Sequence, residues 1–182
     1  MIAIKINDQS VQSMLNRLAG RMGNLTPAMR ELGEQLVRGT KRRFELGRDW
    51  GGVHWLPNTQ ATILNFLSKT KGNFTKKGGY SKKGMTRLLK KEPLTGESRK
   101  LRTTIFYQAS ATGVTIASPE EYAATQHFGA MRGAFGRTSR GSAIPWGNIP
   151  PRPFMPILRD GSLPPSAAQL VMDILAGYIS PE

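Results

Sequence analysis

One stretch of this chain is too basic to lie in a hydrophobic core, whereas the remainder is nearly ordinary in charge. Residues 69–102 contain 12 Lys and Arg residues but only two acidic ones, Glu92 and Glu97. The resulting net charge of +10 makes up most of the +14 carried by all 182 residues. Such a concentration of one charge indicates a surface for an acidic partner, and nucleic acid is the first candidate.

The N-terminal part has the patterns of a packed core. Residues 2–6, in which isoleucine takes every second position, predict a short strand with one buried face. Residues 11–22 have the apolar spacing of an amphipathic helix, and a side-chain oxygen of Asp8 or Ser10 can cap it.

A second helix is predicted to begin at Thr26, a capping residue, with Pro27 at its first helical position. The apolar stripe of this helix consists of Leu32, Leu36, Val37, Thr40 and Phe44. Gly47 is expected to end the helix, because glycine readily adopts the left-handed conformation found at helix C-termini.

The middle of the chain, residues 48–93, has little regular periodicity. We expect a short helix over residues 58–67. Residues 71–84 are rich in Lys and Gly, and Phe74 and Tyr80 flank a Gly-Gly pair. This composition is typical of a hairpin tip or a disordered arm, because it offers little apolar surface to offset the entropy of ordering.

A β-hairpin follows the basic stretch. Its first strand is predicted from the alternation of Leu101, Thr103, Ile105 and Tyr107. Residues 109–113 are expected to form the turn, and Val114 and Ile116 mark the second strand. A helical turn then begins at Tyr122 and is expected to stop at Gly129.

Ser166 is expected to cap a final helix. Together, the predicted helices and strands make the fold class α+β. We expect a small antiparallel β-sheet packed by two N-terminal helices and one C-terminal helix, with long extended loops. Residues 1–182 are treated as a single domain with a basic arm at about 69–91. The two long loops, residues 71–84 and 132–150, are poor in apolar residues, and we expect neighbouring subunits to order them.

The residue inventory argues against an enzyme. The chain has no Cys and only two histidines, His54 and His127, which is too few for a typical zinc site. No nucleotide-binding, hydrolase or metalloprotease motif is present, so neither catalytic residues nor a metal or cofactor is expected. No apolar run approaches the ~20 residues of a membrane span, and no basic leader precedes the apolar N-terminus.

The tryptophans and one arginine have two interpretations each. Trp50, Trp55 and Trp146 can each fill a core, and we favour this interpretation for Trp55. Trp146 stands between a proline and a glycine and is the better interface candidate. Arg152 lies between prolines, in an extended segment that either docks on a neighbour or forms a structural crossover beside the sheet. The predicted subunit-interface residues are Trp146, Pro150, Arg152, Pro153 and Phe154.

Four motifs in order resemble the phage virion morphogenesis family, which includes the tail-completion proteins of Mu-like and P2-like phages. They are Phe44 with residues 51–57, residues 94–96 leading into Leu101 and Ile105, residues 122–129, and residues 149–155. The motif residues expected to be structural are Phe44, Trp55, Gly96, Tyr122, Phe128 and Gly129.

The resemblance implies a structural role at the head–tail junction of a phage, as a neck, tail-completion or tail-terminator protein. It implies a homo-oligomer, with a hexameric ring as the expected form, located in the virion and in the host cytoplasm during assembly. The implied partners are a head connector, adaptor or stopper protein, a tail terminator or tail tube protein, and the genomic DNA in the lumen. No membrane is implied.

The basic arm has three interpretations: a solvated loop, a DNA-contacting surface, or a surface for an acidic protein. We favour DNA because Phe74 and Tyr80 are interleaved with lysines. Its cations are Lys69, Lys71, Lys76, Lys77, Lys82, Lys83, Arg87, Lys90 and Lys91. The alternative to a head–tail junction protein is a free-standing, sequence-nonspecific DNA-binding protein.

Overall fold

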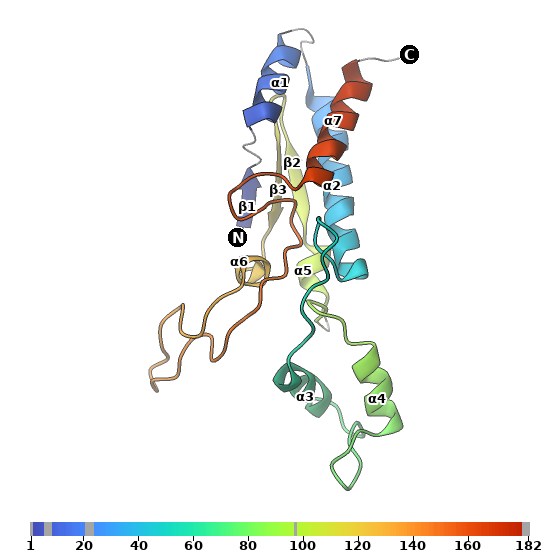
Figure 1. Ribbon diagram of the computed structural model, residues 1–182, viewed down its shortest axis with the longest axis vertical. Helices are drawn as coiled ribbons and strands as arrows, with labels where there is room; N and C mark the ends of the chain where they lie inside the picture. Colours follow the sequence, from blue (N-terminus) through green and yellow to red (C-terminus); the bar gives the residue numbers. More distant parts are fainter. Residues whose placement is uncertain (1, 6–8, 21–23, 97, 180–182) are drawn as a thin grey trace.

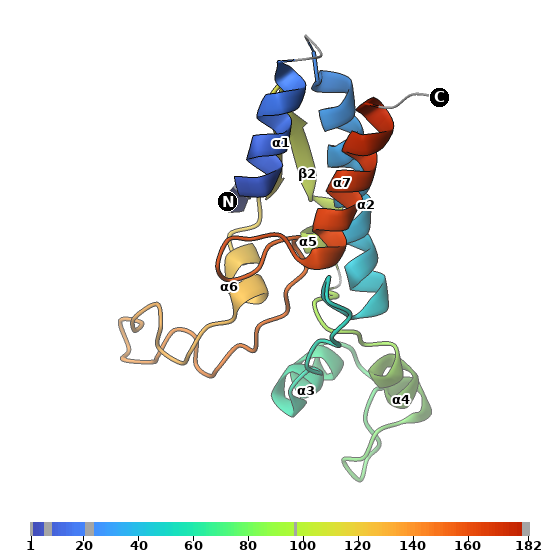
Figure 2. The same ribbon diagram turned by 45° about the horizontal axis from the view of Figure 1, so that its top comes forward.

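The computed structural model describes residues 2–5, 9–20, 24–96 and 98–179, and it has an elongated shape. A body of three helices and a small sheet lies at one end of the molecule (Figure 1). Two projections, one containing α3 and α4 and one a long loop, extend from the other end of the body (Figures 1 and 2). The expected contributions of Ile6, Asp8 and Met22 to the first strand and helix lie outside the described residues.

The sheet contains three antiparallel strands in the order β1-β3-β2: β1 (Ile2–Lys5), β2 (Phe106–Ala109) and β3 (Val114–Ser118). Ile4 and Tyr107 flank Ile116 of the central strand. The N–H of Ser110 donates to the carbonyl of Gly113 at 2.8 Å and closes the β2–β3 turn. The α+β class and the hairpin are therefore confirmed.

The first hairpin strand starts later than predicted, because residues before it form the short helix α5 (Lys100–Thr103). Leu101 and Ile105 are buried all the same, at 4% and 3% exposure. Two residues four positions apart face the same side in a strand and lie close in a helix, so their apolar spacing fits both structures. The alternation alone could not distinguish them.

Three helices cover the sheet and form the core with it: α1 (Gln9–Ala19), α2 (Thr26–Leu46) and α7 (Pro165–Ile179). Helix α2 packs against β2, β3 and α7. The fully buried side chains at this contact are those of Met29, Leu36, Ile116, Val171 and Leu175. Gly33 allows the close approach of α2 and β2, because a Cβ at this position would lie 2.2 Å from Cδ2 of Tyr107.

The helix ends agree with the sequence only in part. Gly47 ends α2 in the left-handed conformation (φ 59°), as predicted. Thr26 is already helical, and the side chain of Asn24 accepts its N–H at 3.0 Å, so Thr26 is not the cap. Ser166 is also not a cap, because it lies inside α7 and its hydroxyl donates to the carbonyl of Trp50 at 2.6 Å.

One projection, residues 58–93, is a small folded unit that we call the basic lobe. It contains α3 (Gln60–Ser68), the predicted short helix, and α4 (Lys82–Leu89), an unpredicted helix that packs against α3. Asn73 is fully buried between them and donates to the carbonyls of Leu67 and Thr70 at 2.8 and 3.0 Å. The lobe tip is a hairpin closed by a bridge between Phe74 and Tyr80, so the hairpin interpretation is confirmed.

The second projection is the loop of residues 130–149, which follows α6 (Ala123–Phe128) and its predicted stop at Gly129. It is a narrow ribbon with bridges between Ala130 and Ile149 and between Arg137 and Ala143. Both projections thus have hydrogen bonds of their own. The expectation that only neighbouring subunits order these loops is wrong, because turns and backbone pairing satisfy their polar groups locally. None of the described helices is both long and apolar enough to cross a membrane.

Candidate functional site

The two projections are attached to the body at one junction, where segments far apart in the sequence meet. Phe44 from α2 forms its centre. The ring of Phe44 lies 5.5 Å from that of Trp55, edge to face, and 5.1 Å from that of Phe154. All three rings are at most 6% exposed. The first and last motifs thus meet in one aromatic cluster, and Trp55 is a core residue as predicted.

Tryptophan side chains fasten the extended segment of residues 149–155 to the body. The indole N–H of Trp50 donates to the carbonyl of Phe154, and that of Trp55 donates to the carbonyl of Pro153, each at 3.0 Å. Arg152 also donates its backbone N–H to the carbonyl of Gln126 in α6, at 3.0 Å. The segment is therefore held on two sides, by residues 50–57 and by α6.

His127 is the third contact of this segment and is only 2% exposed. Its Nδ1 atom accepts the backbone N–H groups of Phe154 and Met155 at 3.1 and 3.3 Å, and Nε2 lies 3.3 Å from the carbonyl of Ile157. Nε2 must therefore carry the proton and donate it to Ile157. Burial lowers the pKa of His127 from 6.5 to about 4, so the neutral imidazole is the folded form at neutral pH.

The predicted interface residues at this junction differ in how deeply they are buried. Phe154 is fully buried inside the subunit, whereas Arg152 is 6% exposed and borders a cleft. For Phe154 the interface prediction is wrong, because the aromatic cluster encloses its side chain. For Arg152 contact with a neighbour stays a prediction. Pro150 and Pro153 are half-buried, and their contact with a neighbour stays a prediction.

Trp146 lies outside the core, as expected, with 84% of its side chain exposed. Three other large apolar side chains on the same loop are also exposed: Met131 at 74%, Phe135 at 57% and Ile144 at 36%. The loop carries three arginines as well, and no acidic residue occurs between positions 122 and 159. Sequence reasoning identified Trp146 only, because the partners of an irregular loop cannot be found by periodicity.

Most cations of the basic lobe are exposed. Seven of the nine point into solvent: Lys69, Lys71, Lys76, Lys77, Lys82, Lys83 and Lys90. Arg87 and Lys91 are half-buried instead, with their charged groups 4.8 and 5.1 Å from the ring centre of Phe66. Phe66 is thus a platform for two cations, and the short apolar run of residues 63–67 gave no indication of this role.

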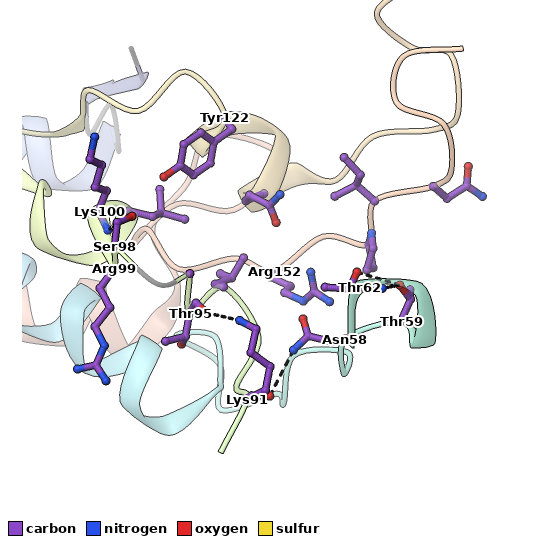
Figure 3. Close-up of a pocket in the computed structure, with 17 residues that line it drawn as sticks. Asn58, Thr59, Thr62, Lys91, Thr95, Ser98, Arg99, Lys100, Tyr122 and Arg152 are labelled. Atoms are coloured by element: carbon purple, nitrogen blue, oxygen red, sulfur yellow. Dashed lines mark hydrogen bonds between the residues drawn. The ribbon is translucent and has the colours of Figure 1, made fainter. Parts of the chain in front are cut away.

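A polar cleft of about 410 Å³ separates the basic lobe from the junction (Figure 3). Its described lining comes from the start of α3, from the segment after α4, from α6 and from the segment before Arg152: Asn58, Thr59, Thr62, Lys91, residues 94–96 and 98–101, Tyr122, Gln126, residues 148–150 and Arg152. Among the structural motif residues, Gly96 and Tyr122 border this cleft.

Two other motif residues lie next to the junction. Phe128 stacks edge to face on His127 with ring centres 4.4 Å apart. Position 129 requires glycine, because a Cβ there would lie 2.7 Å from the carbonyl oxygen of Ile149.

The structure thus consists of a body that bears two projections, both rich in basic residues and attached at one junction. The model of the phage virion morphogenesis family matches residues 6–180, nearly the whole chain, and the chain belongs to this family. It is therefore a tail-related phage virion morphogenesis protein, and the family assigns it a structural, non-enzymatic role. Comparison with curated proteins gave no match, and neither did comparison with solved structures.

Proposed function

We propose that this chain is a ring-forming protein of the head–tail junction, acting as a neck, tail-completion or tail-terminator subunit. The observation that carries the proposal is the position of both projections at the same end of the body (Figure 1). Repeated head-to-tail contacts between identical subunits close into a ring, with a hexamer as the expected form. In such a ring the projections of all copies gather on one face or in the lumen.

The basic lobe contacts the genomic DNA in the lumen. Lys82 and Lys83 stand in the first turn of α4, at the positive end of the helix dipole, where cations lower helix stability. An external anion would offset this unfavourable position, although Lys83 also donates to the carbonyl of Lys71 at 3.3 Å. Lobe charges on exposed, flexible side chains suit phosphate contact without sequence preference.

Part of the expected irregular arm forms helix α4. Whether this helix reads bases must therefore be judged from its side chains. Helix α4 carries no Asn or Gln, the side chains that read adenine, and Arg87 is stacked on Phe66. These features favour phosphate contact over base contact.

The loop of residues 130–149 contacts a neighbouring protein through Trp146 and the apolar side chains beside it. Exposed aromatic side chains of this kind are typical of interface hot spots. The neighbours fitting this position are another copy of this chain, a head connector, adaptor or stopper protein above it, and a tail terminator or tube protein below it.

Quantitative mass spectrometry of purified particles, combined with light scattering of the purified chain, tests this proposal. We expect a few copies per particle and association of the chain on tail or connector proteins. The alternative, a free-standing DNA-binding protein, requires that the chain is absent from particles and binds duplex DNA as a monomer or dimer. That outcome would overturn the proposal.

A further inference from the structure

The polar cleft contains a buried cation without a counter-ion among the described residues. Arg152 is 6% exposed, and Figure 3 places it near the middle of the cleft. Its guanidinium donates through Nε to the carbonyl of Leu56 and through Nη2 to that of Pro57, each at 3.0 Å. An arginine has five N–H donors, so these bonds leave most of them available. A buried charge that is solvated only by two carbonyls remains costly.

The other described residues that line the cleft increase its positive potential. Lys91, Arg99 and Lys100 border it, and none of its described lining residues is acidic. Burial lowers the pKa of Arg152, which reflects the energetic cost of holding this charge in the fold. An entering anion would offset this cost.

We propose that the cleft binds an Asp or Glu side chain carried by an extended segment of a neighbouring protein in the particle. A carboxylate and a guanidinium form two parallel charge-assisted hydrogen bonds, which provide both energy and orientation. The site lies outside the exposed cations of the lobe. The proposal therefore goes beyond the DNA contact and holds or fails independently of it.

The remaining polar groups of the cleft suit a peptide backbone. Two side-chain amides line it, Gln126 from α6 and Asn58 from the segment just before α3, and the Asn58 amide also donates to the carbonyl of Lys91 at 3.3 Å. The side-chain amide of Gln126 makes no hydrogen bond to another described residue. Amide groups pair with the N–H and C=O groups of an extended chain.

Double-stranded DNA fits this cleft poorly. Arg152 is enclosed by the junction and the lobe, whereas the phosphates of a duplex lie on the outside of a wide, convex cylinder. The exposed lysines at the lobe tip meet such a surface without obstruction. The two kinds of anion are thus expected at two different places.

Nuclear magnetic resonance of the intact chain tests the proposal through the side-chain Nε–H signal of Arg152. The probe is a tetraglutamate peptide blocked at both ends, compared with inorganic phosphate and with a short DNA duplex. The cleft is closed by Gly96→Phe, because Gly96 borders it and a Cβ there meets open space. The matched control is Gly177→Phe, on an exposed part of α7 where a Cβ also meets nothing.

We expect the peptide to shift the Arg152 signal in the unmodified chain and in the Gly177→Phe variant. Gly96→Phe should weaken peptide binding by about tenfold or more, which corresponds to one well-formed ion pair. The folds of both variants are verified from the backbone signals of the body. Equal peptide binding by both variants would overturn the proposal and indicate general attraction to a basic protein. A shift caused by the duplex or phosphate, but not by the peptide, would overturn it in favour of a phosphate site.

Discussion

His127 and Phe154 are joined by two interactions, although 27 positions separate them in the sequence. Nδ1 of His127 accepts the backbone N–H of Phe154 at 3.1 Å, and the two rings meet edge to face with centres 5.2 Å apart. The neutral imidazole is required, because a protonated Nδ1 cannot accept a hydrogen bond. The junction that holds both projections thus depends on the protonation state of one side chain.

The first prediction is that His127 makes the stability of the chain dependent on pH. Its pKa is about 4 in the folded chain, below the ordinary 6.5, so the unfolded state binds more protons between these values. The contribution is complete above about pH 6.5 and is lost as the pH falls to about 4, a change of about 3 kcal/mol. Urea unfolding from pH 7 to pH 4 measures it.

The control for this prediction is His127→Gln, whose side chain does not titrate. Carboxylates also titrate near pH 4, so the informative quantity is the difference in unfolding free energy between the two proteins at each pH. We expect this difference to shrink as the pH falls. A constant difference across the range would show that His127 does not titrate as inferred.

The second prediction contrasts two tryptophans. Trp55→Ala removes a buried ring and a hydrogen bond to Pro153, and should lower the free energy of unfolding by about 3–5 kcal/mol. Trp146→Ala should change it by less than about 0.5 kcal/mol, because Trp146 is 84% exposed. Trp146→Ala should nevertheless block the joining of heads and tails. Thermal unfolding measures the change in stability, and an in vitro assay measures the joining of heads and tails. A large loss of stability from Trp146→Ala would place that ring inside the fold.

The third prediction is that the basic lobe unfolds separately from the body. Gly84 of α4 lies against Asn73, and a Cβ at Gly84 would be 2.0 Å from the Asn73 carbonyl oxygen. Gly84→Ala should therefore disrupt the packing of α3 and α4. Hydrogen exchange should become faster in residues 60–89 and remain unchanged in α2 and β3.

Gly79→Ala is the matched control, since a Cβ at Gly79 would have an ordinary contact of 3.6 Å with Thr75. It should leave exchange in the lobe nearly unchanged. Loss of protection throughout the body of Gly84→Ala would show that the lobe and body form one cooperative unit.

The fourth prediction concerns the exposed lysines of the lobe. If about half of its nine cations contact phosphates, log K for duplex DNA should fall with log[salt] at a slope near −4, without sequence preference. Changing Lys76, Lys77, Lys82 and Lys83 to Gln should make the slope shallower by about 0.9 for each phosphate that is no longer neutralised. Fluorescence anisotropy at several salt concentrations measures it.

Particle assembly with the same fourfold variant separates the two candidate partners of the lobe. Particles that join but retain or eject the genome poorly indicate that the lobe serves DNA. Particles that fail to join while DNA binding is unchanged would identify the lobe as a protein-binding surface and refute the DNA assignment.

A helix or strand can be predicted from the sequence where the apolar spacing fits only one of these structures. It cannot be predicted where the spacing fits both. The apolar stripe of α2 and its end at Gly47 follow from helical spacing and glycine conformation. Leu101 and Ile105 fit both a helix and a strand, which is why the alternation predicts a strand where α5 lies. Helix α4 escapes prediction because its lysines and glycine resemble a loop, although Ser81 caps it by accepting the N–H of Gly84 at 3.0 Å.

The candidate site is less predictable than the fold, because it depends on contacts between distant segments. Trp55 and Phe154 both stand in recognisable motifs, but nothing in the spacing indicates that both pack on Phe44. The burial of Arg152 likewise depends on Leu56 and Pro57, about a hundred positions away. Among the features of the sequence, only the family resemblance links these segments.

The central claim, a ring at the head–tail junction, is tested most directly by electron cryo-microscopy of intact particles. We expect a closed ring of this chain, with six-fold symmetry, at the head-proximal end of the tail. The basic lobes should face the DNA channel, and the loops bearing Trp146 should contact neighbouring chains. A reconstruction that shows the chain as an isolated monomer on the shell, or with its lobes directed away from the channel, would contradict the account.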